Sequence, residues 1–543
     1  PQSPMPPLSM ERPIRTDVIL EDDEVLAERP EDEMSIPQDI EIEIEPDVDE
    51  DGNTIISFGE ELPESTSDDF YENLAEEMDQ RDLSSLASDI LAMYSEDRES
   101  RSDWERTYSE GLGLLGMDTT DRSVPFQGAS GVHHPLLSEA ITQFQSSAYK
   151  ELLPAGGPVT TRVIGKVTPE RREQATRVKE FMNYQITEVM QEYDPELDQM
   201  LFYLPLSGSA FKKIYYDEAL GRAVSKFITS EDLVVPYETT ALQSANRITH
   251  MIRQNTNDIR KLQQSGFYRD IELMPSAEPQ TSVTEKIDEL EGARPTSYSS
   301  SDIMTLLECH INLDLPEFED LDEAGEPTGI QLPYIVTMEE GCSEILSIRR
   351  NWEEEDPLKN KKQYFVHYKF LPGLGFYGFG LIHMIGGLSK SATSILRQLI
   401  DAGTLANLPA GFKARGLRVR NDDEPLQPGE WRDVDAPGGA LRDSLLPLPY
   451  KEPSGTLLNL LGVLVDSGRR FAAITEMQTG DMNEAMPVGT TVALLEKGMQ
   501  VMSAIHKRLH YSQKIEFRLL AETFAEYLPQ QYPFEVIGGE RMV

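Results

Sequence analysis

Cysteine is nearly absent from this sequence: its 543 residues contain only Cys309 and Cys342. Neither belongs to a CxxC pair, so we expect no disulfide framework and a reducing compartment. The most apolar run, residues 457–465, is far shorter than the ~20 residues of a membrane-spanning helix. The acidic, proline-rich start also lacks the basic-then-apolar order of a signal peptide. We therefore expect a soluble protein with no membrane partner.

Signatures of catalysis are missing as well. The chain has no GxxxxGK[ST] phosphate loop and no GxSxG nucleophile turn. His133 and His134 are adjacent, and neighbouring residues of a helix point about 100° apart. We interpret them as capping or packing residues rather than as a shared metal site. The sequence therefore predicts no catalytic residue, no metal and no cofactor, and the protein is not expected to be an enzyme.

One glycine motif resembles a nucleotide site. Gly373, Gly375 and Gly378 match GxGxxG between a predicted strand and a predicted helix, and Asp401 follows about 20 residues later, as in dinucleotide-binding proteins. However, the bulky Phe376 lies in the turn that a pyrophosphate would approach, and no alternating strand–helix pattern follows that could build a parallel sheet. We interpret the motif as a glycine-rich corner that joins a sheet to a helix.

Positive charge is scarce: the formal net charge is −46. Residues 1–70 contain 23 acidic residues and only three arginines, a net charge of −20. So acidic a protein is not expected to bind DNA tightly and non-specifically, although DNA could slide through a channel built from it. Residues 1–65 mix acids, prolines and isolated aliphatic residues, which predicts either an extended arm laid on a partner or a solvated tail.

Strand patterns dominate between residues 159 and 370, and several are separated by short polar turns that indicate hairpins. Helical patterns precede and interrupt them, which predicts an α+β protein with antiparallel strands inserted among helices. A polar stretch at 275–301 is predicted to be a mobile loop. The expected helices span 70–93, 98–115, 136–152, 169–192 and 195–207, and the expected strands span 161–167, 210–217, 223–228, 247–253, 305–313, 334–339, 344–350 and 364–370.

The most informative stretch begins at residue 378. A helix over 381–403 carries one apolar stripe and, on its other side, small polar residues with Lys390 and Arg397. A second helix over 454–475 is apolar nearly all round, which indicates burial on several sides. Two such helices predict a wall element that stands beside copies of itself. The stripe consists of Leu381, Ile385, Leu388, Ala392, Ile395 and Leu399.

The insert between these helices contains a positive cluster. In an extended strand Lys413 and Arg415 share one side, Arg418 and Arg420 share a side as well, and Gly416 allows a bend between the pairs. Two interpretations stay open. The cluster either contacts DNA phosphates or acidic partners, or it forms intersubunit salt bridges to Asp422, Asp423, Glu424 or Asp433.

A flexible segment follows the second helix. Residues 476–490 have no apolar periodicity and combine glycines with turn-favouring residues, whereas the helix predicted after them is strongly periodic. We expect this segment to move between two rigid helices and to present a negative tip. Its key residues are Gly480, Asp481, Met482, Asn483, Glu484, Met486 and Pro487.

Several runs, taken in order over about residues 70–535, resemble the portal, or head-to-tail connector, proteins of tailed bacteriophages, most closely the short-tailed type. They include SRSDWERTYSEGLGLLG, PFQGASGVHHPLLSEAI, ELLPAGGPV, GFGLIHMIGGLSKSATSILRQLIDAGTLANLPAGFKARG and DMNEAMPVGTTVALLEKGMQVMSAIHKRLH. No single run is a catalytic signature; the specificity lies in their order.

The resemblance implies a domain plan for the portal fold. An acidic arm (1–65) precedes a mixed α/β wing (66–377), a first stem helix (378–403), a small α/β clip (404–453) and a second stem helix (454–475). A tunnel loop (476–490) and a wing or crown helix with a C-terminal segment (491–543) follow. Family members are usually longer at the C-terminus, so a crown or barrel missing from this chain is a further expectation.

The resemblance also implies a function. Such subunits form a ring of twelve at one capsid vertex, through which double-stranded DNA is packaged and ejected. Expected partners are the major capsid protein, the terminase large subunit, a tail adaptor and a scaffolding protein, in the host cytoplasm during assembly and then in the virion. Lys390, Arg397, Lys413, Arg415, Arg418 and Arg420 would line the channel. Two alternative functions compete with this one: another ring or shell component of a virion, and an enzyme packaged in one.

Overall fold

The computed structural model divides the chain into two units, residues 1–66 and 67–543. Within the first unit it describes only the antiparallel pair β1 (Asp47–Val48) and β2 (Thr54–Ile55). The expected arm otherwise lies outside the described residues. In the second unit the structure describes residues 70–117, 124, 126, 128–163, 165, 167–218, 220–273, 281–292, 303–321, 326–407, 411–413, 418–419, 434–435, 445–447, 450–471 and 488–528, without the side chains of 411–447, 471 and 488–502.

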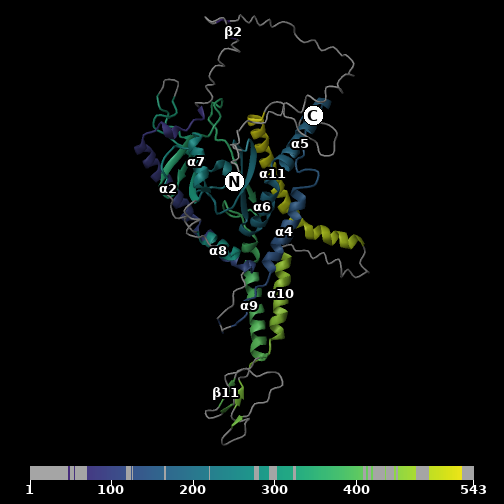
Figure 1. Ribbon diagram of the computed structural model, residues 1–543. Helices are drawn as coiled ribbons and strands as arrows, with labels where there is room; N and C mark the ends of the chain where they lie inside the picture. Colours follow the sequence, from purple (N-terminus) through teal and green to yellow (C-terminus); the bar gives the residue numbers. More distant parts are fainter. Residues whose placement is uncertain are drawn as a thin grey trace, which may run out of the picture. The chain divides into compact units, whose positions relative to one another are not determined.

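The larger sheet is an antiparallel meander of five strands in the order β5-β6-β7-β8-β9. Its strands are rich in β-branched and aliphatic residues, and α2 (Gln80–Ser100) covers it (Figure 1). Leu83 and Ile90 of α2 pack with Leu307 and Val336 in one buried cluster. The strands are β5 (Leu233–Val234), β6 (Arg247–Asn255), β7 (Ile303–Leu313), β8 (Leu332–Glu339) and β9 (Glu344–Arg350).

The smaller sheet has the order β10-β3-β4 and is also antiparallel. It comprises β3 (Ser209–Asp217), β4 (Arg222–Ile228) and β10 (Phe365–Lys369). The main hydrophobic core joins this sheet to α4 (Leu136–Leu152), α6 (Tyr193–Ser207) and α11 (Val488–Tyr527). Phe144, Leu201, Tyr368 and Leu509 lie at its centre and are at most 1% exposed.

A buried polar network ties the two sheets together. Nζ of Lys213 on β3 donates to both carboxylate oxygens of Glu308 on β7, at 2.6 and 2.5 Å. His310, two residues along β7, contacts Oε1 of Glu308 through Nε2 at 2.8 Å. Burial opposes ionisation of Glu308, yet Lys213 and His310 hold the pKa of this carboxyl well below its usual range. The sheets are therefore joined by a charged contact as well as by apolar packing.

The remaining helices attach around these layers. They are α3 (Ser102–Leu112), α5 (Pro169–Tyr184), α7 (Thr256–Gln264), α8 (Ser282–Glu291), α9 (Leu381–Asn407) and α10 (Gly455–Phe471), with 3-10 turns at Leu74–Glu76, Gly113–Leu115 and Leu242–Ser244 and a π-helical turn at Gln185–Val189. Between α9 and α10 lie two strand pairs, β11 (Gly411–Lys413) with β14 (Leu445–Pro447) and β12 (Arg418–Val419) with β13 (Val434–Asp435).

The predicted α+β class with antiparallel strands is confirmed, and seven of the eight expected strands are found. The strand expected at 161–167 was wrong: its described residues contain no strand, and Thr161 and the nearby Val159 contact α5 instead. Oγ1 of Thr161 donates to the carbonyl oxygen of Ala175, and the Asn183 side chain bonds both backbone groups of Val159.

Two other expectations require correction. The predicted loop at 275–301 contains α8, which Thr281 caps by accepting a hydrogen bond from the Thr284 backbone and which buries Val283 completely. The helix expected from residue 98 begins instead at Ser102, because α2 continues to Ser100. Arg101 separates the two helices with φ −107° and ψ 8°.

Candidate functional site: the α9–α10 hairpin and its root

Helices α9 and α10 lie side by side (Figure 1). In α9 the predicted stripe is the buried face, with Leu381, Ile385 and Ala392 at most 2% exposed. In α10, however, apolar side chains remain in contact with water: Leu458 is 60% exposed, Leu460 45% and Val463 62%. Fully burying a leucine or valine is worth about 1.5–3 kcal/mol. The hairpin therefore presents an apolar surface that a further protein surface would stabilise by covering it.

Glycines let both helices approach the rest of the protein closely. A Cβ atom on Gly111 of α3 would lie 2.2 Å from Cγ2 of Ile382 in α9, and a Cβ atom on Gly468 of α10 would lie 2.5 Å from Cδ2 of Leu136 in α4. Beside the second contact, Arg469 forms an ion pair with Glu139. Near the end of the hairpin that joins the rest of the protein, called here the hairpin root, each helix is therefore held by a contact between a glycine backbone and an apolar side chain.

The glycine-rich corner before α9 is a crossing of two backbones. A Cβ atom on Gly208, where φ is +86°, would lie 2.5 Å from the carbonyl oxygen of Gly378, and one on Gly380 would lie 2.2 Å from the carbonyl oxygen of Leu206. The Gly378 amide donates to Oγ of Ser209 at 2.9 Å. The GxGxxG stretch thus lies at the junction of β10 and α9, as the corner interpretation expects.

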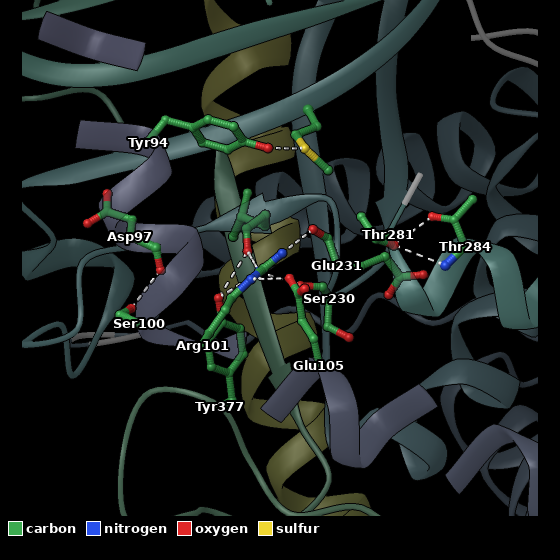
Figure 2. Close-up of polar contacts among 12 residues, drawn as sticks. Tyr94, Asp97, Ser100, Arg101, Glu105, Ser230, Glu231, Thr281, Thr284 and Tyr377 are labelled. Atoms are coloured by element: carbon green, nitrogen blue, oxygen red, sulfur yellow. Dashed lines mark hydrogen bonds and ion pairs between the residues drawn. The ribbon is translucent and has the colours of Figure 1, made fainter. Parts of the chain in front are cut away.

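Arg101 is the polar centre of the hairpin root (Figure 2). Its Nη1 donates to the carbonyl oxygens of Ser230 and Leu233, at 3.1 and 2.8 Å, and to the hydroxyl of Tyr377 at 2.9 Å. Nε donates to Glu105 at 2.9 Å. The guanidinium is buried, so these contacts replace its lost hydration. Tyr377 belongs to the corner that starts α9, which ties this corner to α3 and to the turn before β5.

Glu231 lies beside this centre and is only 6% exposed. Its backbone carbonyl accepts a hydrogen bond from Arg101, but its own Oε2 has no hydrogen-bond partner, and neither do the nearby buried hydroxyls of Tyr108 and Ser230. Burial, followed by the charge of Asp232, raises the pKa of Glu231 to about 7. This carboxyl is therefore the group at the root whose charge changes near neutral pH.

The residues predicted to line a channel divide into three groups. Lys390 is exposed on α9. Arg397 contacts the loop before α4 of the same chain: it donates to the carbonyl oxygens of Gly131 and Val132, at 3.2 and 2.8 Å, and meets Nε2 of His133 at 2.7 Å. Lys413 and Arg418 belong to β11 and β12, whose side chains lie outside the described residues, as do Arg415 and Arg420.

The expected tunnel loop falls almost entirely outside the described residues, which omit 472–487. The helix predicted after it is α11, and it begins at Val488. The histidine pair has packing and bonding partners of its own: besides the His133 contact with Arg397, the His134 amide donates to Oγ1 of Thr393 at 3.1 Å. Both contacts connect the entry of α4 to α9.

An open groove of about 650 Å³ runs between α11 and the edge of the smaller sheet. The rings of Tyr216 and Tyr527 stack in it with their centroids 4.5 Å apart, and Lys362 pairs with Glu526 at 3.0 Å. Its charged side chains are paired with one another or with backbone, so nothing in the groove converges on a reacting atom.

Sequence reasoning missed Arg101, Glu231 and the Lys212–Glu516 pair discussed below. Their partners lie about 130 to 300 residues away, and no local pattern marks such contacts. Among the described residues, no three His, Cys, Asp or Glu side chains are arranged to hold a metal, and no helix has the length and apolarity to span a membrane. A scan against models of protein families finds no match, and a search of the curated proteins finds no matching relative.

Proposed function

We propose that this chain is the subunit of a portal ring, the head-to-tail connector of a tailed bacteriophage of the short-tailed type. Copies of the chain, twelve in the family it resembles, would surround a channel for double-stranded DNA. The α9–α10 hairpin is the stem in this proposal, β11–β14 belong to the clip, and the sheets with α2–α8 and α11 form the wing.

The observation that carries the proposal is the exposed apolar surface of α10. A helix that is apolar nearly all round and yet exposed in a single chain has no stable place in a monomer. In a ring, the hairpin of one subunit packs beside the hairpin of the next, and Leu458, Leu460 and Val463 lose their contact with water. Such a contact between successive copies is head-to-tail, and repeated head-to-tail contacts build either a closed ring or an open filament.

Charge supports a conduit for DNA rather than a clamp. The acidic body repels phosphates at distances within about 8 Å at physiological salt. Sparse cations, such as Lys390 and the basic residues around β11 and β12, would then touch DNA without holding it. In this proposal the protein is structural and not an enzyme. Its partners are the major capsid protein, the terminase large subunit, a tail adaptor and a scaffolding protein, in the host cytoplasm and then at the portal vertex of the virion.

The second candidate is another ring or shell component of a virion, such as a tail or capsid protein. The exposed surface of α10 favours self-association in general and fits this candidate too. The two differ in the particle: a portal is one closed ring with an axial hole, whereas a shell or tail-tube protein forms sheets, shells or stacked tubes.

Electron microscopy of negatively stained particles tests the proposal. The full chain is expected to form twelvefold rings with an axial hole, and monomers or flat sheets would overturn it. Leu460→Asp with Val463→Asp is expected to leave folded chains that no longer form rings. Leu220→Asp is the matched control, because Leu220 is 56% exposed in the turn after β3, away from the hairpin, and rings are expected to persist.

A further inference from the structure

Helix α5 has an unusual position for a helix of 16 residues: Met182, near its end, is its only buried residue. The C-terminal part is attached to the protein, where Phe181 meets Phe524 edge-on and Asn183 bonds the backbone of Val159. The first turns are exposed on every side. Thr168 begins the helix by accepting a hydrogen bond from the Arg171 backbone. A helix that buries so little gains little stability from packing.

The charge of this segment is opposite to that of the protein. Residues 162–180 contain six basic and three acidic residues, in a chain with a net charge of −46. Arg162, Arg172, Arg177 and Lys179 are all exposed. None of these four forms an ion pair with another described residue. Other arginines on helices and strands, such as Arg222 and Arg247, are by contrast paired with a carboxylate.

The charges are also segregated around the helix. Arg172 and Lys179 are seven residues apart, so they share one face, with Thr176 between them. Glu173 and Glu180 lie on a neighbouring face, about 100° round the helix. The cationic face, defined here as Arg172, Thr176 and Lys179, is therefore free of carboxylates along about 10 Å of helix axis.

We propose that the cationic face of α5 binds the phosphate backbone of double-stranded DNA, as a second contact surface separate from the stem and clip. This inference rests on the proposed function, which brings DNA to the protein. Charge density favours DNA over an acidic polypeptide. A duplex carries about one negative charge per 1.7 Å of its axis, so about six phosphates lie along the 10 Å that the cationic face spans. An extended polypeptide offers at most one charge per ~3.3 Å.

The contact is weak in one subunit and gains strength by repetition. Two cations per subunit neutralise about two phosphates, and the affinity then depends on salt with a slope of about −1.8 in log K against log salt concentration. A ring repeats the face at regular intervals, so one DNA segment can meet several copies. The surrounding acidic protein keeps the contact reversible because it repels the same phosphates.

Binding of a labelled linear DNA duplex to the full-length oligomer, measured between about 50 and 200 mM salt, tests the proposal. Arg172→Gln with Lys179→Gln is expected to reduce the salt slope by about 1.8 per contacting subunit and to weaken binding most at low salt. The matched control is Arg81→Gln with Arg260→Gln, which removes two exposed, unpaired cations from α2 and α7. The control is expected to bind DNA like the unmodified protein. Circular dichroism verifies that both variants are folded.

Equal salt slopes for the unmodified protein and the α5 variant would overturn the inference, as would an absence of DNA binding at low salt. If polyglutamate competes with the labelled duplex as effectively as unlabelled DNA does at equal charge concentration, the ligand of the cationic face would be an acidic polypeptide rather than DNA. Electron microscopy separates the two proposals. If the protein forms rings and the α5 substitutions do not change DNA binding, the α5 inference is wrong and the portal proposal stands. If the protein is monomeric and its DNA binding depends on the cationic face of α5, the portal proposal is wrong and the α5 inference stands.

Discussion

Lys212 and Glu516 form an ion pair that excludes solvent completely: Nζ lies 2.9 Å from Oε1 and both side chains are 0% exposed. Ser225 donates to the same oxygen at 2.6 Å, the Tyr368 hydroxyl donates to Oε2, and the Tyr193 ring lies 4.0 Å from Nζ. The pair joins β3 to α11, so the last helix is fixed to the smaller sheet by charge as well as by apolar contact.

Removing one partner of this pair leaves the other charge buried and unpaired. Glu516→Gln is expected to lower the free energy of unfolding by about 3–5 kcal/mol, whereas Lys212→Met combined with Glu516→Leu is expected to recover most of that loss. Urea unfolding measures both. The exposed pair Arg518–Glu522 is the control, and Arg518→Gln is expected to cost less than about 1 kcal/mol. A small loss for Glu516→Gln would contradict the buried contact.

Glu231 predicts a loss of stability with rising pH. Its folded pKa of about 7 lies above the usual 4.5, so the folded state binds the proton more tightly. The stability that protonated Glu231 contributes to the folded state is complete below about pH 4.5 and is lost as the pH rises through 7. Glu231→Gln is expected to be more stable relative to the unmodified protein at pH 8 than at pH 5, by about 2.5 kcal/mol. The exposed Glu238→Gln is the control, and an equal pH dependence in both variants would refute the assignment.

His250 predicts the opposite dependence. Burial, and next the charge of Lys213, lower its pKa to about 3, so the folded state favours the neutral imidazole. This stability is present above the unfolded pKa of about 6.5 and is lost as the pH falls toward 3. At pH 5 the loss is about 2 kcal/mol. Between neutral pH and pH 5, the free energy of unfolding of His250→Gln, measured by thermal unfolding, is expected to fall by about 2 kcal/mol less than that of the unmodified protein. His510→Gln, at an exposed position, is the control and is expected to show the same pH dependence as the unmodified protein.

The backbone crossing at the hairpin root predicts a sharp difference between two glycines. Gly208→Ala places a Cβ atom against the Gly378 carbonyl at a φ of +86°, and neither backbone can move away cheaply. We expect a loss well above the roughly 1–2 kcal/mol that a left-handed conformation costs alone. Gly221→Ala, where φ is +63° and no atom lies within 4 Å of the new Cβ, is expected to show only the conformational cost. Differential scanning calorimetry compares the two.

Substitution of the basic residues near β12 tests whether they contact DNA or form ion pairs between subunits. If the chain is a portal subunit as proposed, replacing Arg418 and Arg420 by alanine is expected to leave ring assembly intact and to slow DNA packaging, because the proposed channel would lose positive contacts. Arg81→Ala controls for the lost charge. Packaging is measured as nuclease-protected DNA and assembly by electron microscopy. Rings that fail to form would instead identify these arginines as intersubunit ion-pair partners.

The sequence by itself determined the class of fold and most of its elements. Strand-type runs separated by short polar turns located β3, β4 and β6–β10, and the three- and four-residue spacing of Leu381, Ile385, Leu388 and Ala392 identified the buried face of α9. These signals are local, because periodicity reports which face of an element meets the core. α8 carried such a signal too, in its Thr281 cap and the spacing of Val283 and Ile287, but polar neighbours concealed it.

The tertiary structure alone decided how those elements are joined. Arg101 could be recognised as the centre of the hairpin root only once Ser230 and Tyr377 were beside it, and Glu231 acquires its raised pKa from burial that no local pattern encodes. The strand expected at 161–167 failed for the same reason: β propensity forms a strand only where a neighbouring edge is free to pair, and the described residues of this segment pair with no strand but lie beside α5. The protonation state of Glu231, the burial of Arg101 and the pairing of strands all depend on contacts between residues far apart in the chain. Local sequence patterns do not encode such contacts, so these properties could not be predicted from the sequence.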